Sequence, residues 1–274
     1  MIEERAHAKV NLVLRVGAPR PDGLHPLCSL FASLQLADTV RVTAADQDEV
    51  VCPGVDGDNL AAAAVAAFRA AAQQAELPPL RIEIDKRVPV AAGLAGGSAD
   101  AAAVLRAANA IAGSPLSVEA LRRVAATLGS DVPSQVLPTH SLVSGIGEIV
   151  DPLDLPAMTL VLVPQEKGLS TGAVYTELDR LGSFAPDLDV EALHELAAGP
   201  LDGLAVGLVN DLQPAALALR PELTEPIEQL LDAGALAAQV TGSGPTTFGV
   251  FADRAAAERA ADRIPAAIVT GLNT

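Results

Sequence analysis

The stretch PVAAGLAGGSAD, residues 89–100, follows a strand-like segment at 80–85 and opens an alanine-rich run that predicts a helix ending near Gly113. Its small residues let backbone N–H groups approach a ligand, and the first helical turn has N–H groups without intrahelical partners. The helix dipole adds partial positive charge there, so the stretch predicts a loop that holds an anion such as phosphate. It fits neither a Walker A loop nor the Gly-x-Gly-x-x-Gly pattern. The alternative is a tight strand-to-helix turn packed in an alanine-rich core.

The composition indicates a folded protein with an aliphatic core. The chain has 274 residues, which allows one large domain or two ordinary ones. Half of the residues are hydrophobic and 19% are charged, which excludes disorder as the main state. Only 2% are aromatic, so an aromatic side chain beside a functional motif carries more weight than usual. The net charge of −16 argues against a nucleic-acid partner but not against a nucleotide, which local donors can bind.

The chain lacks the patterns of secreted, zinc-binding and membrane proteins. Cys28 and Cys52 are too few for a disulfide framework or a zinc site. Residues 1–5 lack the apolar core of a signal peptide, and the uncharged run 233–252 is broken by TGSGP at 241–245. We therefore expect a cytoplasmic protein without a membrane partner.

Local patterns predict strands and helices in mixed order. Strands are expected at 8–16, 36–44, 80–85, 158–163, 235–240 and 246–251. Helices are expected at 59–73, with Asn59 as N-cap, and at 117–128, 170–181, 190–198, 221–233 and 254–263. Because there is no strict β-α repeat, the order predicts an α+β protein with two lobes. A spacer between Pro152 and Pro156 puts the expected boundary between an N-terminal lobe, 1–153, and a C-terminal lobe, 154–274.

Other local clusters combine polar residues with glycines. In AKVNL (8–12), Lys9 and Asn11 share one face of the first strand because side chains two apart point the same way. The remaining clusters are PDGLH (21–25) with SLF (29–31), LGSDVP (128–133), and TGSGP (241–245). On spacing alone, Lys9 can equally be a solvated strand residue and Asp131 a cap of the turn at Gly129. His25 can be a surface residue, and Phe31 and Tyr175 can be packing residues.

In their order and over nearly the whole chain, these segments resemble the motifs of GHMP-type small-molecule kinases. The resemblance is carried by AKVNLVLRV (8–16), RPDGLHPLCSLF (20–31), VPVAAGLAGGSADAAAV (88–104), LGSDVP (128–133), SGIGEIV (144–150), LVNDLQPAALALRPEL (208–223) and VTGSGPTTFGVF (240–251). The glycine loop and TGSGP are general to the family. AKVN, RPDG-x-H and NDLQPAAL are typical of its branch that acts on 4-diphosphocytidyl-2-C-methyl-D-erythritol.

The resemblance implies an α+β fold of two lobes with the active site in the cleft between them. The N-terminal lobe would be ribosomal-protein-S5-like and the C-terminal lobe ferredoxin-like. The implied reaction is the ATP-dependent phosphorylation of the 2-hydroxyl of that alcohol, in non-mevalonate isoprenoid biosynthesis, with Mg²⁺ accompanying ATP. The implied partners are a small-molecule substrate and a nucleotide, and the chain would be a monomer or a homodimer.

The resemblance also assigns roles to individual residues. Asp131 would be the catalytic carboxylate and Lys9 its cationic partner. The residues implied at ATP are Asn59, Leu60, Lys86, Val90, Gly93, Leu94, Gly96, Gly97 and Ser98. The residues implied at the alcohol substrate are Asn11, His25, Phe31, Ile146, Tyr175, Gly242 and Ser243. Within this set His25 would read the cytosine edge and Tyr175 would stack on the pyrimidine, and no residue is assigned to the metal.

The chain departs from the family pattern at several positions. Leu24 stands where a tyrosine is usual, Ala91 and Ala95 where glycine is typical, and Ala99 where a second serine is usual. Ser134-Gln135 stand where the family tends to have aromatic residues. Two rival functions therefore stay open, namely a kinase for another small alcohol and a catalytically weak relative that binds nucleotide without turnover.

Overall fold

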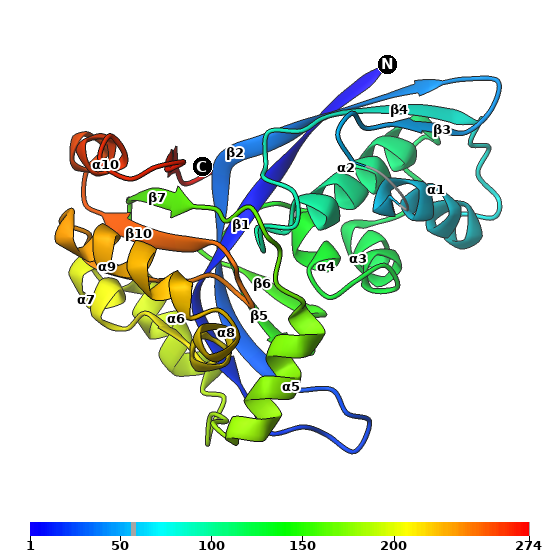
Figure 1. Ribbon diagram of the computed structural model, residues 1–274. Coiled ribbons are helices and arrows are strands. Elements are labelled where there is room, and N and C mark those ends of the chain that lie inside the picture. The colour runs from blue at the N-terminus through cyan, green and yellow to red at the C-terminus, as the bar shows by residue number, and fades with distance from the viewer. Residues whose placement is uncertain (56–58, 274) are drawn as a thin grey trace.

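The structure, a computed structural model, describes residues 1–55 and 59–273, and its strands form two sheets (Figure 1). The first sheet has the order β3 (Glu49–Val51), β4 (Leu80–Asp85), β2 (Leu27–Ala44), β1 (Ile2–Val16) and β8 (Val209–Asn210), and β5 (Ser141–Gly145) joins β2 to β6 (Ile149–Pro152). The second has the order β11 (Ile268–Gly271), β7 (Thr159–Val163), β10 (Thr247–Phe251) and β9 (Ala237–Val240). The protein is therefore α+β, as the order of patterns predicted.

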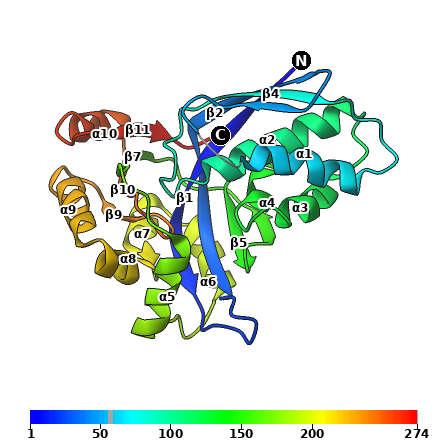
Figure 2. The same cartoon turned by 45° about the vertical axis from the view of Figure 1, so that its right-hand side comes forward.

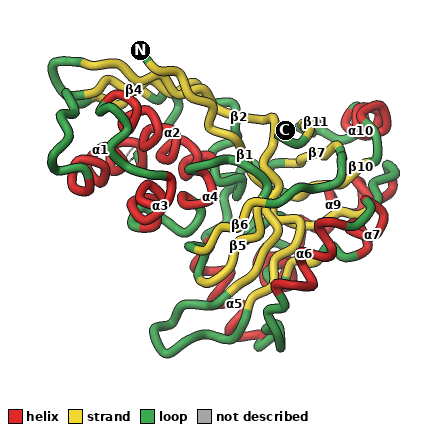
Figure 3. The backbone as a smooth tube through the Cα atoms, turned by 180° about the vertical axis from the view of Figure 1, so that it is seen from behind, coloured by secondary structure: helices red, strands yellow, loops and turns green. Residues whose placement is uncertain are grey.

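The helices form two groups on opposite sides of the long strands β1 and β2, as Figure 3 shows from behind. The N-terminal group is α1 (Leu60–Ala71), α2 (Gly96–Ile111), α3 (Val118–Ala126) and α4 (Val132–Gln135). The C-terminal group is α5 (Thr171–Leu181), α6 (Val190–Ala198), α7 (Leu201–Val206), α8 (Gln213–Leu219), the 3₁₀ turn η1 (Pro221–Leu223), α9 (Thr224–Asp232) and α10 (Arg254–Ala261). Within the described ranges, no helix has the length and apolar character needed to span a lipid bilayer.

The first core lies between α1, α2 and the strands β2 and β4, which Figure 2 shows next to one another. Val40 and Val42 of β2 and Ile82 and Ile84 of β4 point into it. The buried residues of α2 are mostly alanines, which let a helix pack closely because they add little width. The alanine-rich run therefore seats α2, and with it the glycine loop, firmly on the sheet.

The position of β7 explains why residues 160–163 are all apolar. Leu160 and Leu162 pack in one cluster with Val10 of β1, whereas Val161 and Val163 pack in another with α9 and α10. Both faces of the second sheet are therefore covered, and a strand covered on both faces reads as a continuous apolar run.

The two halves of the chain share the first sheet. β8 pairs in parallel with β1, with Leu14 opposite Asn210. Leu34, in the middle of β2, forms an isolated bridge to Leu272. Strand pairing thus ties the C-terminal half to the sheet that begins at the N-terminus, and the lobe boundary between 153 and 154 stays a prediction.

Several element bounds differ from those predicted. β1 begins at Ile2 instead of residue 8, and β2 begins at Leu27 instead of residue 36. The start of β2 is buried almost throughout, so no alternation of apolar and polar residues marked it as a strand. The segment 221–233 is not one helix, because η1 precedes α9 and Pro221 opens the 3₁₀ turn instead. The short elements β3, β5, β6, β8, β11, α4, α7 and α8 were missed because each has too few residues to show a clear period.

Candidate active site

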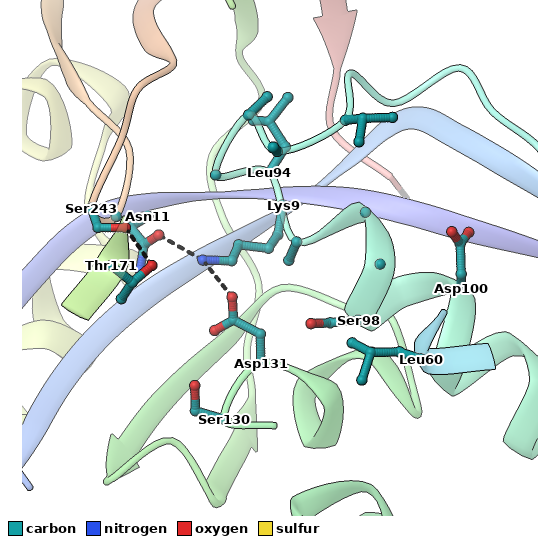
Figure 4. Close-up of a pocket in the computed structure, with 18 of the residues that line it drawn as sticks. Lys9, Asn11, Leu60, Leu94, Ser98, Asp100, Ser130, Asp131, Thr171 and Ser243 are labelled. Atoms are coloured by element: carbon teal, nitrogen blue, oxygen red, sulfur yellow. Dashed lines mark hydrogen bonds and ion pairs between the residues drawn. The ribbon is translucent and has the colours of Figure 1, made fainter. Parts of the chain in front are cut away.

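The predicted motifs meet at a cavity of about 490 Å³. Its wall is built from β1, the glycine loop, the start of α1, the segment before α4, the start of α5 and the TGSGP loop (Figure 4). Sixteen of the eighteen predicted site residues line it, namely Lys9, Asn11, Phe31, Asn59, Leu60, Lys86, Val90, Gly93, Leu94, Gly96, Gly97, Ser98, Asp131, Tyr175, Gly242 and Ser243. The other two, His25 and Ile146, do not line it.

Lys9 is a buried cation at the centre of this wall. Its side chain is 5% exposed, and its Nζ lies 2.7 Å from Asn11 Oδ1 and 3.4 Å from Asp131 Oδ2. The ammonium also lies 4.2 Å from the centre of the Phe31 ring, within the range of a cation–π contact. The reading of Lys9 as a solvated strand residue is therefore wrong, because three neighbouring groups hold its charge inside the protein.

Asp131 stands at the N-terminal end of α4 but does not cap it, since its side chain accepts no capping hydrogen bond. The reading of Asp131 as a helix cap is therefore wrong. Its side chain is 35% exposed and faces Lys9. Figure 4 shows the carboxylate between the Lys9 ammonium and the start of α2. A carboxylate in this position can accept a proton from a ligand beside the cation.

The glycine loop turns on residues in the left-handed backbone region. Ala91 and Ala95 have φ of 55° and 57°, and Gly93 has φ of 78°. A Cβ on Gly93 would lie 2.4 Å from the Gly244 carbonyl oxygen, so the glycine loop and the TGSGP loop touch backbone to backbone. The Lys9 N–H also donates to the Leu94 carbonyl at 3.2 Å, which holds the loop against β1.

The first turn of α2 is open towards the cavity. Ala95 is its N-cap residue and provides no side-chain hydrogen bond. A Cβ on Gly97 would meet only Leu60 Cδ1, at 3.9 Å, so this glycine faces open space. The N–H groups and dipole of a helix end of this kind suit a phosphate group.

A buried ion cluster lies behind the glycine loop. Lys86 Nζ donates to Asp38 Oδ2 at 2.5 Å and to Asp100 Oδ2 at 2.8 Å. Burial works against the charge on Lys86, but Asp100 and Asp38 outweigh it and raise the pKa of Lys86. Two carboxylates thus neutralise the Lys86 ammonium, Asp38 from β2 and Asp100 from α2. The main role of Lys86 is therefore to join α2 to β2, and its attraction for a phosphate is weak. Asp100 Oδ1 is buried without a partner among the described residues.

Asp100→Asn removes one carboxylate from Lys86 at every pH, but its effect on the free energy of unfolding is expected to be more favourable at pH 7.5 than at pH 5. Burial raises the pKa of Asp100 to about 6, whereas an unfolded aspartate titrates near 3.9. The carboxyl therefore contributes stability in its protonated form, fully below about pH 4, and loses it as the pH rises through about 6. The amide of asparagine stays neutral and avoids that loss. Denaturant unfolding of both proteins at both pH values checks this, and an equal difference at the two pH values would contradict it.

Tyr175 lies on α5 and lines the cavity. Burial and the charge of Asp131 raise the pKa of Tyr175 to about 12, so its hydroxyl stays protonated at neutral pH. Near it, Thr171 Oγ1 lies 3.0 Å from Ser243 Oγ, which links the start of α5 to the TGSGP loop (Figure 4). The tyrosine thus reaches the cavity as a partly buried ring with a neutral hydroxyl.

His25 lies behind Tyr175 and not on the cavity wall. Its ring centre is 5.1 Å from that of Tyr175 and 5.7 Å from that of Phe184. Its Nδ1 lies 3.0 Å from the Gly17 carbonyl oxygen and its Nε2 3.3 Å from Asp179 Oδ1. The histidine is buried, so it is not a surface residue, and its contacts support Tyr175 from behind.

The departures from the family pattern lie mostly away from the cavity. Ala99 is buried against the first core, and Ser134 and Gln135 are buried in α4. Leu24 is 48% exposed and does not line the cavity. Only Ala91 and Ala95 line it, and their left-handed backbone explains why glycine suits these two positions.

Several residues of the site were not predicted. Thr171 and Ser130 line the cavity, Asp38 and Asp100 hold Lys86, and Thr241 bonds to Asn11. Asp100 follows the glycine loop directly, so its place there was readable. Ser130 and Thr241 stand in the segments LGSDVP and TGSGP, next to predicted site residues. Asp38 and Thr171 come from segments that no local pattern connects to the site.

Comparisons with known proteins agree with this architecture. Residues 59–138 match the family model of the GHMP kinases N terminal domain, and residues 189–269 match that of GHMP kinases C terminal. A 4-diphosphocytidyl-2-C-methyl-D-erythritol kinase of Streptomyces coelicolor is 44% identical over 262 residues, covering 91% of this chain and 87% of the relative. One of Corynebacterium efficiens is 42% identical over 283 residues, covering 96% and 89%.

Solved structures show the same fold. A crystal structure of a 4-(cytidine 5'-diphospho)-2C-methyl-D-erythritol kinase superposes with a TM-score of 0.83 at 36% identity, over 100% of both chains. Homoserine kinase from Cytophaga hutchinsonii superposes with a TM-score of 0.72 over 100% of this chain and 94% of its own. At 18% identity, the second match shows the fold alone.

Proposed function

The chain belongs to the GHMP kinase family, and from that premise we propose that it transfers the γ-phosphoryl group of ATP to the 2-hydroxyl of 4-diphosphocytidyl-2-C-methyl-D-erythritol. The observation that carries the proposal is the ion pair of the buried Lys9 with the partly exposed Asp131, which shares one cavity with the open first turn of α2. The identity of more than 40% to curated kinases of this alcohol supports the choice of substrate.

The pair fits a phosphoryl transfer to a weakly acidic hydroxyl. The acceptor is a tertiary alcohol, whose pKa lies far above 7, so a carboxylate cannot ionise it fully before the reaction. Asp131 would accept the proton late, while the phosphoryl group transfers through a loose transition state. Lys9 would offset the negative charge that develops on the phosphoryl oxygens. Because Lys9 is buried, water screens its positive charge only weakly.

Magnesium would enter together with ATP. Mg²⁺ in kinases is held by one or two protein oxygens, the nucleotide phosphates and water, so it needs no cage of side chains. Across residues 1–55 and 59–273, no group of three or more His, Cys, Asp or Glu side chains could hold a metal alone. The Ser98 hydroxyl is an oxygen donor on the cavity wall that fits this role. Bound there, the ion would neutralise phosphate charge.

A coupled assay of ADP release tests the proposed function. Purified protein is given Mg-ATP and a panel of alcohols: the cytidyl substrate, 2-C-methyl-D-erythritol, homoserine and mevalonate. We expect ADP release with the cytidyl substrate to exceed release with the others by several orders of magnitude in kcat/KM. Release with another alcohol alone would make the chain a kinase of that alcohol. Nucleotide binding without release from any of them would make it a binding protein.

Tyr175→Ala is expected to raise the KM for the cytidyl substrate about 5- to 150-fold, since one stacked base contributes about 1–3 kcal/mol. The kcat should change little, because Tyr175 would hold the base and not the reacting hydroxyl. Phe184→Leu is the matched control, since Phe184 is the other ring neighbour of His25 and does not line the cavity. Initial-rate kinetics measures both variants. An unchanged KM in an active Tyr175→Ala enzyme would move the cytosine pocket elsewhere.

A further inference from the structure

The NDLQP segment, residues 210–214, has no part in the mechanism above, although its first residue lies close to the site. Asn210 is buried at 5% exposure on β8. Its side-chain amide donates to the carbonyl oxygens of Val240 and Gly242, each at 2.8 Å, and its Oδ1 accepts the Leu212 N–H at 3.0 Å. The amide therefore uses both donors on one short segment of backbone.

The two carbonyl groups that Asn210 binds stand on either side of Thr241. Thr241 is fully buried, and its Oγ1 accepts the Asn11 N–H at 2.9 Å and lies 3.4 Å from Asn11 Oδ1. Asn11 Oδ1 in turn accepts the hydrogen bond from Lys9 Nζ at 2.7 Å. A continuous chain of contacts thus leads from Asn210 through Thr241 and Asn11 to Lys9.

The backbone of β1 explains why Asn11 needs these contacts. The register of β1 against β2 shifts between His7 and Lys9 and again between Asn11 and Val13. Such irregularities interrupt a strand ladder and re-aim its side chains. Here the Asn11 N–H bonds to Thr241 instead, so the orientation of Asn11 depends on where the TGSGP loop lies.

A second residue of NDLQP fixes the same loop. Gln213 Oε1 accepts the Val240 N–H at 2.8 Å, while Gln239 Nε2 donates to the Leu12 carbonyl oxygen at 2.9 Å. β8 itself pairs with β1 beside Leu14. The backbone around Thr241 is therefore anchored from β1 and from NDLQP together, and Asn210 provides the contacts on both sides of the threonine.

We propose that Asn210 is a positioning residue for the phosphoryl transfer: its two hydrogen bonds fix Thr241, which orients Asn11 and so places the Lys9 ammonium against Asp131. The inference rests on the proposed function. Asn210 does not line the cavity, so it acts through these neighbours and not on the substrate.

Asn210→Ala is therefore expected to lower kcat about 10- to 100-fold, because a displacement of about 1 Å at reacting groups costs up to about 10²-fold. The KM for ATP should stay within about twofold. Asn109→Ala is the matched control, since Asn109 is also buried and also holds backbone, by two 3.0 Å bonds to Leu116, but lies at the far end of α2. An unchanged kcat in Asn210→Ala, or an equal loss in Asn109→Ala, would overturn the proposal.

Substitutions of Thr241 provide a second test, which does not depend on whether the Asn210→Ala variant folds. Thr241→Val keeps the shape of the side chain and removes the oxygen that accepts the Asn11 N–H, so kcat should fall by a similar factor. Thr241→Ser keeps the oxygen and should restore kcat to within about twofold of wild type. The double variant Asn210→Ala/Thr241→Val should have a kcat no lower than that of the slower single variant, because both substitutions break the same series of contacts to Lys9. Additive losses would contradict a shared path.

A crystal structure of Asn210→Ala adds a readout that needs no substrate. The Thr241 Oγ1–Asn11 N distance, now 2.9 Å, should lengthen beyond hydrogen-bonding range. An unchanged distance would overturn the positioning role even if the protein acts on a different alcohol. Failure of the proposed function would show separately, as a wild-type protein without activity on the cytidyl substrate.

Discussion

Asp131→Asn is expected to lower kcat for the cytidyl substrate by about 10²-fold or more, the range in which general-base groups contribute. Asparagine keeps the size of the side chain but cannot accept the proton of the alcohol. The affinity for ATP should barely change, because the glycine loop does not depend on the carboxylate. Single-turnover kinetics and a nucleotide titration measure the two quantities on the same preparation.

The fold itself should tolerate this substitution. The Asp131 side chain makes no capping hydrogen bond to α4, so its loss removes only the ion pair with Lys9 at 3.4 Å. Asp253→Asn is the matched control, since Asp253 caps α10 through the Ala256 N–H, and asparagine caps a helix equally well. A kcat of Asp131→Asn close to that of the control would remove Asp131 from the mechanism.

Gly97→Val is expected to weaken ATP binding about 10- to 150-fold, which corresponds to the loss of one hydrogen bond to a charged group, about 1.5–3 kcal/mol. The Cβ of residue 97 meets no protein atom closer than Leu60 Cδ1 at 3.9 Å, so the protein can accommodate the side chain. The branched side chain would then stand in front of the α2 N–H groups, where phosphate has to approach. Titration of the folded variant with ATP measures the effect.

The choice of glycine decides whether a loss of ATP affinity can be separated from a distortion of the loop. Gly93 is unsuitable, because its φ of 78° and the 2.4 Å approach of a Cβ to Gly244 would distort the loop whatever it binds. Gly203→Val is the matched control, since Gly203 lies on α7 with its nearest contacts at 3.8 Å and away from the cavity. ATP affinity that stays equal in Gly97→Val and Gly203→Val would make the loop a packing turn only.

The sequence by itself determined the parts of this protein that local chemistry controls. The small residues of 89–100 are dictated by a loop that turns through left-handed backbone and opens a helix, so the sequence predicted this loop and the helix after it. Asn59 was predicted as the N-cap of α1, and its side chain accepts the Ala61 N–H as a cap does. The shared face of Lys9 and Asn11 followed from the period of a strand, and the two side chains bond at 2.7 Å.

Only the tertiary structure decided which of these motifs act together. The ion pair of Lys9 with Asp131, the cluster of Lys86 with Asp38, and the contact of Asn210 with the TGSGP loop each join segments tens to more than a hundred residues apart. Nothing in a local pattern can separate a solvated lysine from a buried one, because the side chain is the same and the difference lies in what covers it. Burial and partners arise when distant strands pair and pack, and at that step a lysine that could equally be solvated and an aspartate that could equally be a cap became an ion pair on the same cavity as the glycine loop.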